Sequence, residues 1–158
     1  MRELILLRHA HAEPAAVGQD DFDRALSRAG TAEAEAAGRW LAEQGLQPDL
    51  IVLSPARRTR ETLAALLPAI GQIEQQQDQR IYDATPGTLM QVADEHRDIG
   101  RVLLIGHNPG LEQMAALLGS GQSGDFRGMP AAGIAVLKLP ATAALEPGIA
   151  QLAAFWWP

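Results

Sequence analysis

Three short apolar segments, each followed within a few residues by histidine or arginine, constrain the fold of this chain most strongly. They are Leu4 to Leu7, Asp49 to Leu53 and Arg101 to Ile105. Short apolar runs of this kind are typical of strands buried on both faces, as in a parallel sheet. Longer segments with helical spacing lie between them, and strands that alternate with helices indicate an α/β sandwich. We therefore expect a three-layer α/β/α sandwich with a mostly parallel central sheet and no cap domain.

The connecting segments carry the start and stop signals of helices. Ser27 is a typical N-cap for a helix that runs to Gln44, and Gly45 follows its expected end. The glycine-rich stretch 119–128 lacks the Gly-Lys-Ser/Thr ending of a phosphate-binding loop, so we interpret it as a flexible connection. Further helices are predicted for residues 56–67 (ended by Pro68), 86–97 and 110–118, and further strands for 73–77, 135–139 and 149–156.

Composition limits the class of protein. The 158 residues fit one domain, 1–158, and the absence of cysteine excludes disulfides, thiolate nucleophiles and cysteine-ligated metals. A net charge of −6 argues against general nucleic-acid binding, which needs many basic contacts to phosphate. No apolar run approaches the roughly 20 residues that cross a bilayer, and no signal-peptide core is present at the N-terminus. We therefore expect a cytoplasmic protein with no membrane association.

Basic side chains follow the ends of all three apolar segments. Arg8 and His9 follow the first, Arg57 and Arg58 the second, and His107 the third. Ligands of open α/β sheets bind beyond the carboxyl ends of the strands, where parallel strands would bring these side chains together. Arginine is suited to bidentate recognition of oxyanions. The sequence thus predicts a site for a small, highly charged anion, with phosphate as the obvious candidate.

Four sequence blocks, in order, resemble the histidine phosphatase superfamily, which has the phosphoglycerate-mutase-like fold. Leu6 to Ala10 resembles its Arg-His-Gly/Ala signature, and Ser54 to Thr62 resembles its Ser-x-x-x-Arg-x-x-x-Thr block. Ile105 to Pro109 is similar to the block that carries the second histidine. Asp23 to Gly30 is similar to the Arg-Pro-Leu-Thr-x-x-Gly stretch of the SixA-like phosphohistidine phosphatases, with Ala25 in place of proline and Ser27 in place of threonine.

The resemblance implies a role for each matched residue. His9 would attack phosphorus and form a phosphohistidine enzyme, while Arg8 and Arg58 bind the non-bridging oxygens. His107 would be a further donor, and the helix after Pro109 would direct its N-terminus toward the anion. Arg24 and Asn108 are expected to bind substrate, and no metal or other cofactor is implied.

A general acid is harder to place. Larger members of the superfamily have a carboxylate after the third strand, which here corresponds to Asp83; Glu13 is a weaker candidate. Asp83 could equally serve as a cap or turn residue before the helix that begins at Pro86. A phosphohistidine substrate would relax the need for an acid, because imidazole is a better leaving group than an alkoxide.

Several functions remain open at this point. We expect a phosphatase that removes phosphate from phosphohistidine on a protein, such as a histidine-containing phosphocarrier domain. The alternatives are a phosphomonoesterase or mutase-like enzyme acting on small phosphorylated molecules, and a non-catalytic phosphate-binding module. His9 and His11 also match the His-x-His of metal-dependent amidohydrolases, but those form barrels of about 250 residues.

Overall fold

The apolar segments of the sequence form the centre of one sheet in the computed structural model, which describes residues 2–122, 124 and 128–158. The sheet order is β3-β2-β4-β1-β5-β6, with β1 to β4 parallel to one another. Strand β5 pairs antiparallel with β1, and β6 pairs antiparallel with β5. The prediction of a mostly parallel sheet is confirmed. The strands are β1 (Arg2–Arg8), β2 (Leu50–Leu53), β3 (Glu74–Gln77), β4 (Arg101–Gly106), β5 (Ile134–Leu139) and β6 (Gln151–Trp156).

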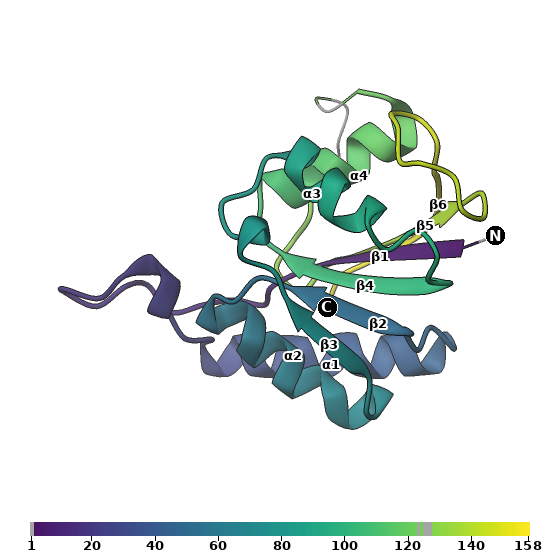
Figure 1. Cartoon of the computed structure of the whole chain (residues 1–158). Helices are drawn as coiled ribbons and strands as arrows, with labels where there is room; N and C mark the ends of the chain where they lie inside the picture. The colour runs from purple at the N-terminus through teal and green to yellow at the C-terminus, as the bar shows by residue number, and fades with distance from the viewer. Residues whose placement is uncertain (1, 123, 125–127) are drawn as a thin grey trace.

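Helices cover both faces of the sheet, so the three-layer arrangement is confirmed (Figure 1). One face is covered by α1 (Arg28–Glu43) and α2 (Arg57–Ile70), and the other by α3 (Pro86–Asp94) and α4 (Gly110–Ser120). Two short 3-10 helices, η1 (Asp21–Asp23) and η2 (Gln79–Ile81), lie in connections. None of the helices in the described ranges is long and apolar enough to cross a bilayer.

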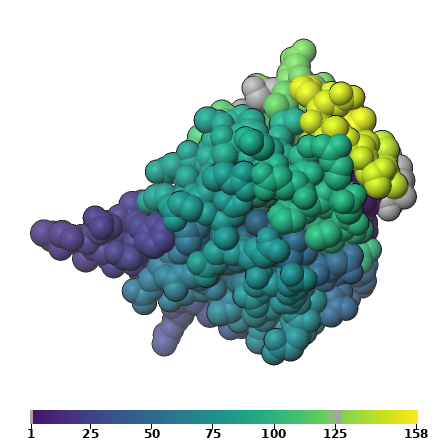
Figure 2. All heavy atoms as spheres, viewed as in Figure 1, coloured from purple at the N-terminus to yellow at the C-terminus, as the bar shows by residue number. Residues whose placement is uncertain are grey.

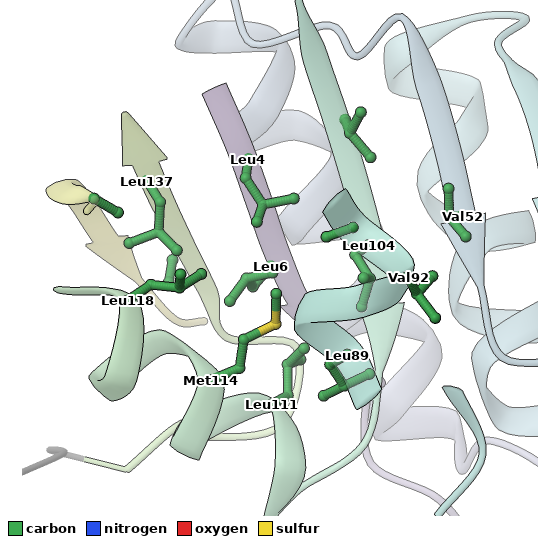
Figure 3. Packing of buried hydrophobic residues seen from close by; sticks show 14 of the residues in the cluster. Leu4, Leu6, Val52, Leu89, Val92, Leu104, Leu111, Met114, Leu118 and Leu137 are labelled. Atoms are coloured by element: carbon green, nitrogen blue, oxygen red, sulfur yellow. The ribbon is translucent and has the colours of Figure 1, made fainter. Parts of the chain in front are cut away.

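Alternate side chains of the central strands supply two separate cores. Leu4 and Leu6 pack on the α3 and α4 side, together with Leu111 and Met114 (Figure 3). Ile5 and Leu7 pack on the opposite side with residues of α1 and α2. This alternation follows from the two-residue period of a strand. Because helices bury both faces of the sheet, the sequences of its central strands are continuous apolar runs.

The helix boundaries agree with the sequence signals except at the ends of α2, α3 and α4. Ser27 caps α1 by accepting the backbone N–H of Gly30, and Gly45 follows with φ of 68°. The prediction that Pro68 ends α2 is wrong, since the helix continues to Ile70. Proline in the last turn removes one hydrogen bond, while Ile70 is buried and its carbonyl accepts the Gln47 amide at 2.6 Å.

Two other boundaries are also shifted. Helix α3 ends at Asp94, and turns occupy the residues before β4 where helix had been expected. Helix α4 extends to Ser120, into the stretch expected to be a flexible connection. Residues 123 and 125–127 of that stretch lie outside the described residues.

The connection between β1 and α1 leaves the body of the molecule as an arm, which we define as residues 13–25 (Figure 1). Its base is closed by the bridge between Ala12 and Leu26 and by the hydrogen bond from Glu13 N–H to the Ala25 carbonyl at 2.8 Å. The arm leaves the edge of the sheet where β1 ends (Figure 1), and it is a prominent projection on the surface of the molecule (Figure 2).

Candidate active site

The carboxyl ends of β1, β2 and β4 bring the predicted side chains to one edge of the sheet. Arg8 is the last residue of β1, His9 follows it, and His107 follows β4. The imidazole rings of His9 and His107 have centroids 5.2 Å apart. Arg58 lies in the first turn of α2, which starts shortly after β2. The parallel order of these strands therefore creates the crevice that the sequence predicts.

His9 is held in one tautomer by its neighbour. Its Nδ1 atom lies 2.7 Å from the carbonyl oxygen of Ala10, which can only accept a hydrogen bond, so Nδ1 carries the proton. Burial, together with the charges of Arg58 and Arg8, lowers the pKa of His9 to about 4. The ring is therefore neutral near pH 7, and its Nε2 atom has a free lone pair.

His107 is held by a buried serine. Its Nε2 lies 2.8 Å from the Ser54 hydroxyl oxygen, which also accepts the backbone N–H of Ala56. The hydroxyl can donate its proton to Nε2, and in that arrangement His107 carries its own proton on Nδ1. Burial, then the proximity of His9 and Arg58, lowers the pKa of His107 to about 3. This ring too is neutral near pH 7.

Buried polar atoms without a partner mark the centre of the site. Four such side-chain atoms occur in the described residues, and three of them are Arg8 Nε, Arg58 Nε and His107 Nδ1. Leaving a buried donor unpaired costs free energy, so three such atoms on residues of one site indicate that a ligand supplies their partners there. Two guanidinium donors and one imidazole donor together fit an anion with several oxygens.

A set of hydrogen bonds around Met129 positions Arg8. The carbonyl oxygen of Met129 accepts Arg8 Nη1 at 3.0 Å and Asn108 Nδ2 at 2.8 Å. The carboxylate of Glu112 accepts the second N–H of Asn108 and the backbone N–H of Met129. Both N–H groups of Asn108 are therefore occupied. Asn108 therefore secures the segment that holds Arg8, and its expected contact with substrate stays a prediction.

Asp21 holds Arg58 from the opposite side. Its carboxylate accepts Arg58 Nη2 at 3.0 Å, and its backbone carbonyl accepts Nη1 at 2.8 Å. The same carboxylate accepts the Tyr82 hydroxyl at 2.7 Å and Arg24 Nη1 at 3.0 Å. The Tyr82 hydroxyl, followed by the two arginines, holds the pKa of Asp21 well below its usual range. Asp21 thus connects Arg58 with Arg24, the expected substrate-binding arginine of the arm, through one carboxylate.

Arg57 and Arg58 have different environments. Arg58 is buried, whereas Arg57 is exposed and pairs with Glu61 one turn further along α2. The orientation agrees with the choice of Arg58 from the motif spacing. The sequence analysis missed Asp21 and Tyr82; the three-residue spacing between Asp21 and Arg24 was the one local signal available.

Neither candidate acid is buried in the site. Asp83 is exposed in a turn with φ of 55°, and Thr85 caps α3 by accepting the backbone N–H of Thr88. The interpretation of Asp83 as a cap is therefore wrong, while the turn role agrees with its backbone conformation. Glu13 is exposed at the start of the arm, where its backbone carbonyl accepts Arg24 Nε.

His11, the second histidine of the His-x-His pattern, contacts a residue outside the candidate site. His11 Nδ1 lies 2.7 Å from the Ser27 hydroxyl oxygen at the start of α1. No group of three or more acidic or histidine side chains suited to a metal ion occurs among residues 2–122, 124 and 128–158. The sandwich is also unlike the barrel of the metal-dependent amidohydrolases.

The fold, and the histidines and arginines gathered where β1, β2 and β4 end, place the chain in a known class of phosphatases. The sequence model of the histidine phosphatase superfamily (branch 1) matches residues 4–100, more than half of the chain. An uncharacterized protein of Mycobacterium tuberculosis is 33% identical over 96% of this chain and 99% of its own length. The chain belongs to the histidine phosphatase superfamily, in its SixA-like branch.

Solved structures and a plant relative extend this comparison. A structure from Agrobacterium tumefaciens assigned as the phosphohistidine phosphatase SixA is 34% identical, with a TM-score of 0.86 over 99% of this chain and 98% of that one. A protein histidine phosphatase SixA complexed with tungstate has a TM-score of 0.84 over 98% and 96% of the two chains; at 19% identity this likeness concerns the fold alone. A chloroplastic protein of Arabidopsis thaliana is 34% identical over 74% of this chain, which covers 59% of the plant protein.

Proposed function

We propose that this protein is a phosphohistidine phosphatase that acts on a phosphorylated protein through a phosphohistidine intermediate on His9. The observation that carries the proposal is the neutral His9 ring, with its proton on Nδ1 and its Nε2 lone pair free, next to buried arginine donors without partners. The likeness to SixA structures supports the substrate class.

The first step transfers the phosphoryl group to His9. Nε2 attacks phosphorus, and the bond between phosphorus and the substrate nitrogen breaks as the new phosphorus–nitrogen bond forms. The departing imidazole takes up a proton from solvent. Arg8, Arg58 and His107 donate to the equatorial oxygens, where the charge of the transition state is spread.

The second step releases phosphate. A water molecule attacks phosphorus of the phosphorylated His9, and the bond to Nε2 breaks. Inorganic phosphate leaves, and His9 returns to its neutral form with the proton on Nδ1. The proton stays on Nδ1 throughout, donated in a hydrogen bond to the Ala10 carbonyl, so Nε2 acts as both nucleophile and leaving group.

The environment of Asp83 favours a substrate with a good leaving group. Its carboxylate is exposed and forms no hydrogen bond within the described residues. General acids are usually tuned by burial or by a neighbouring charge. An imidazole leaving group places little demand on such an acid, whereas the alkoxide of a sugar phosphate places a large one.

The substrate class is tested by comparing two sets of substrates at equal concentrations. One is a histidine-containing phosphocarrier domain phosphorylated on its histidine, and the other is a panel of sugar phosphates. We expect kcat/KM to be much higher for the phosphocarrier domain, with turnover lost in His9→Ala. Preference for a sugar phosphate would establish the small-molecule phosphomonoesterase or mutase-like alternative. Absence of turnover on all substrates, aryl phosphates included, would establish a phosphate-binding module.

The remaining expectations concern the cellular location of the protein, its partners, its domain organisation and its cofactors. Location in the cytoplasm, and the absence of nucleic-acid and membrane partners, stay predictions from composition and charge. We also propose that residues 1–158 act as one domain without a cofactor or metal, since the site's polar groups belong to histidine, arginine and serine side chains.

A further inference from the structure

The arm projects beside the active site and is linked to it by hydrogen bonds and an aromatic contact. It begins four residues after His9, and its residues Asp21 and Arg24 belong to the hydrogen-bond network around Arg58. Phe22 also packs edge-on against Tyr82, with ring centroids 5.3 Å apart. The arm therefore stands next to the site, and Figure 2 shows it as the most prominent projection in that view.

Internal hydrogen bonds give the arm a defined shape. Gln19 exchanges hydrogen bonds with Ala16, and its Nε2 atom donates to the Asp23 carbonyl at 3.0 Å. The tip of the arm, residues 14–18, carries no polar side chain, and the side chain of Val17 is fully exposed. An ordered loop that presents an apolar side chain to solvent is typical of a surface used for contact with another molecule.

The arm is acidic on its exposed surface. The side-chain oxygens of Glu13, Asp20 and Asp23 are exposed and have no hydrogen bond or ion pair in the described structure. The Asp21 carboxylate, by contrast, is offset by Arg24 and Arg58, and the nearby Arg57 is offset by Glu61. Three uncompensated negative charges therefore stand beside a pocket whose own donors attract anions.

This combination separates substrates by the charge around their phosphoryl group. The arginine donors attract the phosphoryl group itself, while the carboxylates of the arm repel further negative charge on the same molecule. Positive charge beside the phosphoryl group would instead be attracted. A small polyanion such as a bisphosphorylated sugar is disfavoured, and a phosphorylated side chain on a basic protein surface is favoured.

We propose that the arm is a docking element for protein substrates that carry basic residues beside the phosphorylated side chain, with Val17 contacting an apolar residue among them. The protein part of this inference rests on the proposed function, whereas the charge preference depends only on the arm. Val17 and the three exposed carboxylates of the arm contribute to selection of the substrate and take no part in the chemistry at His9, whereas Asp21 of the same arm positions Arg58.

The test uses two synthetic phosphohistidine peptides of equal length, one flanked by lysines and the other by glutamates. We expect kcat/KM to favour the lysine-flanked peptide by about tenfold at low ionic strength. The preference should shrink toward unity near 1 M salt, where charges are screened within about 3 Å. Equal rates, or preference for the glutamate-flanked peptide, would overturn the proposal.

A charge-matched pair of variants locates the effect. The arm variant combines Glu13→Gln, Asp20→Asn and Asp23→Asn, and should reduce the preference to less than about threefold. The control combines Glu43→Gln, Asp98→Asn and Glu146→Gln, three exposed carboxylates that the chain places outside the arm; it should keep the wild-type preference. Equal loss in both variants would show that net charge, and not the arm, sets the preference.

The two proposals fail separately. If neither peptide is hydrolysed, the proposed substrate class is wrong, and the charge preference is measured instead with aryl phosphates that carry a quaternary ammonium or a carboxylate substituent. The arm proposal then predicts faster turnover of the cationic aryl phosphate in the wild type and the control, and not in the arm variant. Absence of that difference overturns it.

Discussion

The Nδ1 atom of His9 lies 2.7 Å from the carbonyl oxygen of Ala10, and this contact places the ring proton on Nδ1. The residue that follows the nucleophile thus determines which of its two nitrogens can react. Burial adds to this control, because it lowers the pKa of His9 and keeps the ring neutral. The site therefore presents a prepared nucleophile before any substrate binds.

The first prediction concerns pH. We expect NMR of ¹⁵N-labelled imidazoles to show His9 and His107 titrating near their lowered pKa values of about 4 and about 3. The unfolded imidazoles bind protons near pH 6.5, so unfolding takes up protons below that pH. The free energy of unfolding should accordingly fall as the pH is lowered from 6.5 toward 4. Midpoints at or above 6.5 in the folded protein would contradict the account.

The second prediction separates two adjacent arginines. Arg58→Ala should lower kcat/KM by about 10²–10³-fold, the usual cost of removing a donor to transition-state charge. Arg58→Lys should recover little, because one ammonium group cannot replace the fork of donors. Arg57→Ala is the matched control and should keep most activity, since Arg57 is exposed and paired with Glu61. The opposite pattern would mean that the motif has been aligned one residue out of register.

The third prediction concerns Asp21 as a positioning residue. Asp21→Asn removes the charge that holds Arg58, Arg24 and Tyr82, and should weaken binding of inorganic phosphate and raise KM by about tenfold. Asp21→Glu should recover part of the loss, and kcat should change less than KM. Asp98→Asn, an exposed control, should behave as wild type. Tighter phosphate binding in Asp21→Asn would show that Asp21 competes with substrate for Arg58.

The fourth prediction uses Asp83→Asn to test for a general acid. Asparagine tolerates the left-handed conformation of this turn about as well as aspartate, so stability should hardly change. We expect turnover of aryl phosphates and phosphohistidine to stay within about threefold of wild type. A loss of about 10²–10⁴-fold confined to alkyl phosphates would identify Asp83 as the acid for such substrates. A severe loss on every substrate would indicate that Asp83 orients His9 or His107.

Most of the fold could be predicted because its signals are local. The apolar runs of β1, β2 and β4 are continuous because helices cover both faces of the sheet. Ser27 and Gly45 mark the ends of α1 with side-chain and backbone chemistry confined to a few residues. Pro68 misled the prediction because packing of Ile70 in the core outweighs one missing backbone hydrogen bond.

The candidate site could be predicted only in part. Arg8, His9 and His107 follow strands directly, so the general rule for strand ends locates them. Asp21 lies 37 residues from Arg58 and 61 residues from Tyr82 along the chain. Contacts between residues so far apart in the sequence cannot be predicted from local spacing. The shape of the arm was likewise missed, since hydrogen bonds of Gln19 and a bridge at its base determine it.

The most direct test of the account is to locate the phosphate on the trapped enzyme. The protein is mixed with a phosphohistidine peptide or an aryl phosphate, quenched rapidly without acid, and analysed by mass spectrometry and ³¹P NMR. We predict phosphate on Nε2 of His9, and none in His9→Ala. Phosphate mainly on His11 or His107, or on Nδ1 of His9, would contradict the account.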